Sequence, residues 1–127
     1  MSEAVTEGIR VAVRSEYMQE RSYPSLHRHF FVYHITIENR SSQSVQLVSR
    51  HWVITNGHGD IEEVQGSGVV GVQPFVRPNE KFQYSSACPL DTPVGSMEGT
   101  YRMVRDDGTE FDAQIESFTL VAPNSLN

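Results

Sequence analysis

The sequence predicts an all-β protein, an antiparallel β-sandwich of the immunoglobulin or fibronectin type III kind with about seven strands. Apolar and polar residues alternate with a period of two through most of the chain. Short segments rich in Gly, Asn, Asp and Ser separate the alternating stretches, as turns separate strands. No segment shows a sustained helical period. A small β-barrel is the alternative architecture that the same pattern allows.

The first two expected strands differ in the faces they present. In residues 8–17, Ile9, Val11 and Val13 alternate with mostly charged residues, which is typical of a half-buried strand. Residues 29–39 are β-branched or aromatic on both faces, which favours a central strand. The other alternating stretches predict strands over 44–55, 60–64, 80–87, 96–105 and 110–122.

Turn residues and a change of parity mark the ends and the irregularities of these strands. Asn56-Gly57 and Asp107-Gly108 are strong turn signals. In the last strand the apolar parity changes between Ile115 and Phe118, which predicts a bulge or a kink near residues 116 and 117.

Large aromatic residues define the expected core. Trp52 and Tyr101 are the candidates, and the Tyr101 hydroxyl is expected to bond a nearby backbone group as a tyrosine corner. Arg50 shares strand parity with Trp52. Its charge therefore either points inward and is paired, or the strand is bulged there.

Length, charge and cysteine content limit the domain organisation and the partners. The 127 residues predict one domain, 1–127, with loose ends over 1–7 and 123–127. A single cysteine, Cys88, and no signal pattern predict a cytoplasmic protein. The apolar runs are too short for a membrane span, so no membrane partner is expected. A net charge of −6 argues against a duplex nucleic acid as partner.

The stretch "GSGVVG", residues 66–71, has the G-x-G-x-x-G spacing of a dinucleotide-binding loop. That loop must open a helix whose N-terminus faces the pyrophosphate. Here Pro74, Pro78 and several valines follow, so no helix is expected, and no Lys-Ser/Thr completes a P-loop. The stretch is interpreted first as a glycine-rich connection between strands.

Two ligand hypotheses remain for this connection. The first hypothesis is that its backbone N–H groups form an anion-binding nest. Arg50, Arg77 or Lys81 would supply positive charge if the fold brings them close. The second hypothesis is that the valines of this connection are exposed and contact a protein partner. The candidate partner- or anion-binding residues are Gly66, Ser67, Gly68, Val69, Val70, Gly71 and Arg50.

Metal binding and catalysis are the weaker hypotheses. His27 and His29 would face the same way on a strand, close enough to share a divalent metal, but the sequence shows no third ligand. No base or oxyanion hole accompanies Cys88, which is interpreted as a small buried hydrophobe. The sequence therefore predicts no catalytic residues, no metal ligands, no cofactor and no enzyme.

Three stretches carry a resemblance to a known family. "SRHWVITNGHG", "EEVQGSGVVGVQP" and "CPLDTPVGSMEGTYRMV" closely resemble parts of the ApaG protein family, over about residues 9–121. The resemblance implies a fibronectin type III-like sandwich and a link, by name, to cobalt resistance and magnesium efflux. Related domains in an F-box substrate adaptor and a DNA polymerase delta interacting protein imply an interaction role. Asn79 and Ala87 stand where the family usually has glycine.

A non-catalytic interaction module is the preferred prediction from residues and resemblance together. It would bind an unidentified protein partner through loops or edge strands. Binding of phosphate or pyrophosphate at the glycine-rich connection is the alternative, and divalent-metal binding is the third.

Overall fold

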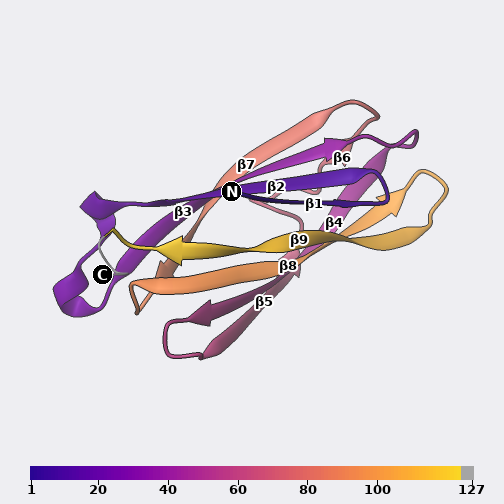
Figure 1. The fold of residues 1–127 in the computed structure, drawn as a ribbon. Helices are drawn as coiled ribbons and strands as arrows, with labels where there is room; N and C mark the ends of the chain where they lie inside the picture. The colour runs from indigo at the N-terminus through magenta and orange to yellow at the C-terminus, as the bar shows by residue number, and fades with distance from the viewer. Residues whose placement is uncertain (124–127) are drawn as a thin grey trace.

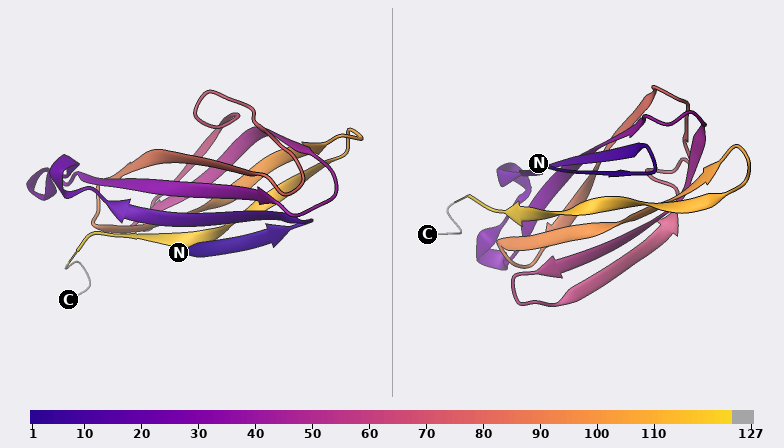
Figure 2. Two further views of the ribbon diagram at one scale, coloured as in Figure 1. Left: turned by 90° about the horizontal axis from the view of Figure 1, so that it is seen from above. Right: turned by 45° about the vertical axis from the view of Figure 1, so that its right-hand side comes forward.

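The structure, a computed structural model, describes residues 1–123 and contains two antiparallel sheets packed face to face (Figures 1 and 2). One sheet has the order β1 (Ser2–Thr6), β2 (Ile9–Tyr17), β3 (His29–Asn39), β7 (Lys81–Leu90). The other has the order β5 (Ile61–Ser67), β4 (Val45–Asn56), β8 (Val94–Arg105), β9 (Glu110–Val121), with the short β6 (Phe75–Val76) also paired to β4. Two single-turn 3₁₀ helices, η1 (Gln19–Arg21) and η2 (Pro24–Leu26), connect β2 to β3. The predicted sandwich is confirmed.

The nine strands of the described residues include two that the sequence pattern did not predict, β1 and β6. β1 lies in the segment that was expected to be loose. Its inward positions are small or polar and Val5 is exposed, so no apolar face in the sequence predicts this strand. It pairs with β2 along all five residues, from Ser2 opposite Val13 to Thr6 opposite Ile9. Of the C-terminal tail expected to be loose, only Pro123 lies within the described residues.

The expected irregularities are present. The pairing of β8 with β9 shifts between Met97, opposite Phe118, and Gly99, opposite Ile115. An advance of three residues along β9 therefore matches an advance of two residues along β8. This extra residue on β9 confirms the bulge predicted at residues 116 and 117. A second register shift lies between Leu47 and Ser49 on β4, next to Arg50.

Aromatic rings fill the centre of the core. Trp52 packs edge-on against Tyr33, Tyr101 and Phe118, with ring centroids 5.3, 6.2 and 6.1 Å away. Trp52 and Tyr101 are both buried, as predicted. The tyrosine-corner prediction is wrong, because the Tyr101 hydroxyl hydrogen-bonds the hydroxyl of Tyr84 on β7 and joins the two sheets.

The two departures from the family pattern cause no strain. Asn79 has a φ of 68°, in the left-handed region that asparagine tolerates. Ala87 lies within β7, opposite Val32, and is not among the residues with positive φ. No turn precedes Cys88, so alanine is acceptable there.

One flank of the sandwich is closed and the other leaves strand edges free. The Ser2 hydroxyl donates to the Glu116 carbonyl at 3.2 Å, and the Gln114 N–H donates to the Thr6 hydroxyl at 3.0 Å, so β1 is tied to β9. On the opposite flank β7 and β5 are the outer strands. No helix among residues 1–123 has the length and apolar character needed to cross a membrane.

Candidate functional site

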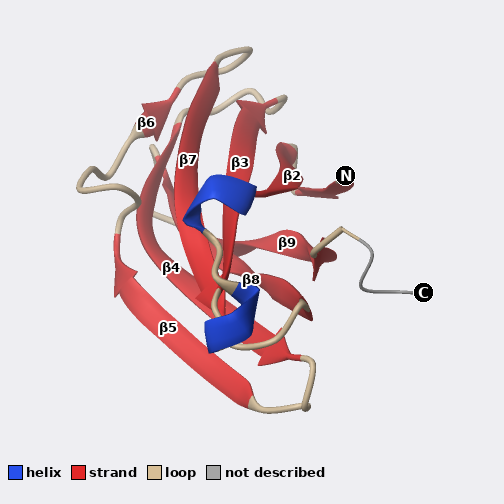
Figure 3. Cartoon of the chain, turned by 90° about the vertical axis from the view of Figure 1, so that its left-hand side faces the viewer, coloured by secondary structure: helices blue, strands red, loops and turns tan. Residues whose placement is uncertain are grey.

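Residues 66–74, here called the glycine loop, leave the end of β5 and return to β4 through β6. In Figure 3 this connection projects from the sandwich beside β5 and β6. No helix follows Gly71, since the chain passes directly to β6 and then β7. The prediction that the G-x-G-x-x-G spacing does not form a dinucleotide loop is thus supported by the local structure.

The tip of the glycine loop is a tight reverse turn. The N–H of Val69 donates to the Val72 carbonyl at 2.8 Å, and the N–H of Val72 donates back at 2.9 Å. The two residues between them, Val70 and Gly71, have φ values of 42° and 84°. Two successive left-handed residues are the signature of a type I′ turn.

Hydrogen bonds hold the glycine loop against β4. The Gly68 N–H and the Gln73 side-chain amide both donate to the Val48 carbonyl, each at 2.9 Å. The Leu47 N–H donates to the Pro74 carbonyl at 3.0 Å. The Val69 side chain is 1% exposed and belongs to the core. The loop is therefore part of the rigid framework rather than a free appendage.

Arg50 clamps the start of this loop. Its Nη1 donates to the Ser67 and Gly68 carbonyls at 3.0 and 2.9 Å. A Cβ on Gly66, which lies opposite Arg50 on β5, would sit 2.8 Å from the guanidinium. The glycine thus leaves the space that the guanidinium occupies.

Arg50 also lies close to the tyrosines between the sheets. Burial raises the pKa of Tyr84 and Tyr101 above the usual range, and the nearby positive charge of Arg50 partly opposes the increase. Each sequence alternative for Arg50 is met in part, since its partners are backbone carbonyls and not a carboxylate. The side chain is on the inner side and is hydrogen-bonded, and a bulge lies beside it.

Gly68 meets a steric requirement as well as a conformational one. Its φ is 60°, and an added Cβ would lie 2.1 Å from the Val72 carbonyl oxygen. Backbone atoms of the turn cannot yield at that distance. Gly66 and Gly68 are explained by packing.

The geometry argues against the anion hypothesis. The nest was expected from the N–H groups of Gly66, Ser67 and Gly68. The Gly68 N–H already donates to the Val48 carbonyl, and the next N–H, that of Val69, donates to the Val72 carbonyl, so consecutive free N–H groups are not available here. The loop directs two carbonyl oxygens at a cation, Arg50. The other two cations do not gather there. Lys81 lies 4.0 Å from Glu38, and Arg77 lies in the turn between β6 and β7.

Three apolar side chains of this region are exposed, and they are here called the loop patch: Val70 (57%), Val72 (47%) and Phe75 (70%). The expectation that Val69 is exposed is wrong, because the turn directs its side chain inward. Phe75 is not among the residues that the sequence predicted for this site. The pattern that could have indicated it is the apolar pair Phe75-Val76 between Pro74 and Arg77-Pro78, which is too short to predict a core strand.

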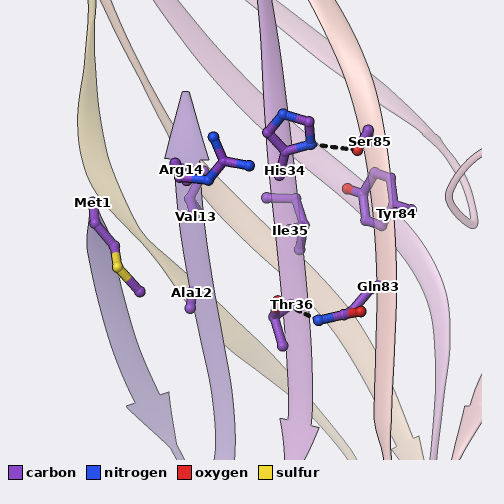
Figure 4. A pocket seen from close by; sticks show the side chains of 10 residues that line it. All are labelled: Met1, Ala12, Val13, Arg14, His34, Ile35, Thr36, Gln83, Tyr84 and Ser85. Carbon is purple, nitrogen blue, oxygen red and sulfur yellow. Dashed lines mark hydrogen bonds between the residues drawn. The ribbon is translucent and has the colours of Figure 1, made fainter. Parts of the chain in front are cut away.

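A second candidate lies on the outer face of the β1-β2-β3-β7 sheet, in a shallow hollow of about 540 Å³ (Figure 4). At one end His34 Nδ1 lies 2.6 Å from the Ser85 hydroxyl, and His34 Nε2 lies 3.2 Å from a carboxylate oxygen of Glu16. These residues lie on three different strands, β2, β3 and β7, so no sequence motif joins them.

A serine, a histidine and a carboxylate in line have the residue types of a hydrolase triad. Here all three groups lie on an open sheet face in contact with water. Water screens the carboxylate, and nothing desolvates the hydroxyl, so the arrangement is a surface hydrogen-bond network.

The paired-histidine hypothesis does not match the local structure. His27 precedes β3, has a φ of 56° and is exposed, whereas His29 is the first residue of β3 and is buried. They therefore do not share a strand face. Burial also lowers the pKa of His29 below its usual value. Within residues 1–123 no three His, Cys, Asp or Glu side chains gather as a metal site.

Cys88 is predicted to resist alkylation in the folded protein. It is buried on β7, and burial raises the pKa of its thiol to about 11. At pH 8 the thiolate, which is the reactive form, is then about a hundredfold scarcer than in an exposed cysteine. Iodoacetamide labelling followed by mass spectrometry should be at least about 100-fold slower in buffer than in denaturant. Equal rates would contradict the assignment of an inert thiol.

Comparisons with known proteins agree with this architecture. The Protein ApaG of Anaeromyxobacter dehalogenans (strain 2CP-C) is 57% identical over 127 residues, the full length of both chains. That of Thiobacillus denitrificans is 50% identical over the same full length. A crystal structure of an ApaA protein from Bordetella pertussis matches with a TM-score of 0.89 and 44% identity, over 92% of this chain and 95% of its own. The sequence profile of the ApaG domain matches residues 19–105, and the chain belongs to the ApaG domain family.

Proposed function

We propose that this protein is a non-catalytic interaction module that binds a protein partner through the loop patch. The observation that carries the proposal is the exposure of Val70, Val72 and Phe75 on a segment fixed by hydrogen bonds to β4. Exposed apolar groups gain free energy when a partner removes them from water. A fixed backbone lowers the entropy that binding costs.

The conformation of Val70 supports the same proposal. A β-branched residue at a φ of 42° is strained, and left-handed backbone costs about 1 kcal/mol in a residue with a Cβ. Asparagine or glycine fits the first central position of a type I′ turn without that cost. Valine at this position therefore lowers the stability of the fold, and it does so at an exposed tip where its side chain is available to a partner.

Phosphate or pyrophosphate binding is the weaker alternative, because the Gly68 N–H is already bonded and Arg50 donates to the loop carbonyls. The network of Ser85, His34 and Glu16 is exposed and the thiol of Cys88 is protonated, so neither supports catalysis. The link of the family to cobalt resistance and magnesium efflux stays a prediction. An interaction module could serve such a trait without binding metal itself.

The proposal is tested by capture with a variant of the loop patch. Two tagged baits are compared: the wild-type protein and the double variant Val70→Asn with Phe75→Ser. Each is used to capture binding proteins from an extract of cells in which the wild-type protein is naturally expressed. Removing exposed apolar area should reduce the amount of the specific partner, quantified by mass spectrometry, about tenfold or more.

The matched control is Ile61→Ser, which removes an exposed apolar side chain on β5, outside the patch. It should retain the partner. Equal capture by the wild type and the patch variant, with both folded, would contradict the proposal. Loss of the partner in the Ile61 variant alone would place the contact on β5 instead.

A further inference from the structure

The two free edges of the sandwich are not equivalent. β5 carries Glu62 and Glu63 in its edge, and charges there discourage pairing with another strand. β7 has Lys81 at its start and Pro89 near its end, but residues 82–88 between them include no charge and no proline. Over residues 1–123 the only strand that pairs with β7 is β3. β7 is therefore the less protected edge.

The hydrogen-bond pattern shows which backbone groups of β7 face outward. The Asn39 N–H donates to the Glu80 carbonyl at 3.0 Å, and Glu38 lies opposite Lys81. In an antiparallel ladder this makes Glu38 and Lys81 a non-hydrogen-bonded pair. The register then continues unbroken to Leu90. By alternation, the N–H and C=O groups of Gln83, Ser85 and Ala87 point away from β3, toward the free edge.

The edge is complementary to a second copy of itself. With Ser85 on a twofold axis, Gln83 faces Ala87 of the other copy, and about six main-chain hydrogen bonds form, two for each facing pair. On the inner side the half-buried Phe82 and Tyr84 face the smaller Cys88 and Ser86. Large residues thus lie opposite small ones.

The charge distribution also favours a second copy of this chain as the partner of β7. In this register Lys81 faces Pro89 of the second copy, so the pairing brings no like charges into direct register despite the net charge of −6 on each chain. If β5 paired antiparallel with itself about Glu63, the Glu63 side chains of the two copies would lie opposite each other, with Glu62 adjacent.

We propose that two copies of this chain associate through antiparallel pairing of β7 with β7, which joins two four-stranded sheets into one continuous sheet. The contact is isologous, as a twofold dimer requires. It uses residues of β7, which are separate from those of the loop patch. The inference does not depend on the proposed function.

The test is sedimentation velocity of the full-length protein over a series of concentrations up to about 1 mM, because a dimer is populated by mass action. The dimer mass should appear as concentration rises. Ala87→Pro removes an N–H that the monomer does not use, so the fold should survive. The dissociation constant should rise about tenfold or more. Ala87→Lys, which keeps the N–H and adds a charge at the edge, should have the same effect.

The matched control is Gln65→Pro on β5. Gly68 donates its N–H to Val48, with Ser49 opposite Ser67, so by the same alternation the Gln65 N–H faces the free edge of β5. This variant should dimerise like the wild type. A monomer at the highest concentration, or a dimer unaffected by both Ala87 variants, would overturn the proposal. Loss of the dimer in the Gln65 variant alone would also overturn it.

Discussion

Gly99→Ala is expected to lower the free energy of unfolding by about 3 kcal/mol, at the upper end of the usual range for overpacking. An added Cβ would lie 2.0 Å from the carbonyl oxygen of His51. Gly99 lies in β8 opposite Trp52, whose ring fills the centre of the core, so neither strand can move aside without disturbing that packing. Urea unfolding followed by tryptophan fluorescence measures the change.

Gly108→Ala is the matched control for this prediction. Gly108 has a φ of 85° in the turn between β8 and β9, and an added Cβ would meet no atom within 4 Å. Only the conformational cost of about 1 kcal/mol applies there. If the two alanine variants are equally stable, the close approach of β8 to the β4 backbone is not the reason for the glycine.

Arg50→Met is expected to destabilise the protein by about 2 kcal/mol, because one exposed and one partly buried carbonyl lose their charged donor. Methionine keeps most of the side-chain volume, so the change reports mainly on the lost hydrogen bonds. Amide hydrogen exchange of Val69 and Val72 at the loop tip should become faster, since the loop loses its anchor to β4.

Arg102→Met serves as the control for removing an arginine. Arg102 pairs with Glu110 and Asp112 on the exposed face of β8 and β9, where solvent screens the charges. It should have little effect on stability and none on exchange in the glycine loop. Unchanged exchange at Val69 and Val72 in the Arg50 variant would show that Arg50 does not hold the loop.

Most of the strands that the sequence predicted are those in which alternation coincides with burial; β5, which is largely exposed, instead followed the Asn56-Gly57 turn signal. β3 matches its predicted bounds because both its faces carry β-branched and aromatic residues. The bulge in β9 followed from a change of parity at Ile115 and Phe118. β1 was missed because its contribution is main-chain pairing and hydroxyl bonds to β9, which leave no trace in a hydrophobic pattern.

The candidate site was only partly predictable. The sequence indicated that "GSGVVG" lacks a helix and that Arg50 shares the parity of Trp52. It could not indicate that Arg50 bonds the loop carbonyls, because that contact depends on the pairing of β4 with β5. Alternation likewise could not separate buried Val69 from exposed Val70, since a type I′ turn rather than a strand orients them.

Val70→Asn tests the central claim most directly, because a binding role and a structural role predict opposite results. Asparagine tolerates the left-handed conformation at φ 42°, so the variant should be about 1 kcal/mol more stable in urea unfolding. With the exposed valine gone, the same variant should capture less of the protein partner than the wild type. A variant that is less stable, or that retains the partner in full, would contradict the claim that Val70 is strained in order to meet a partner.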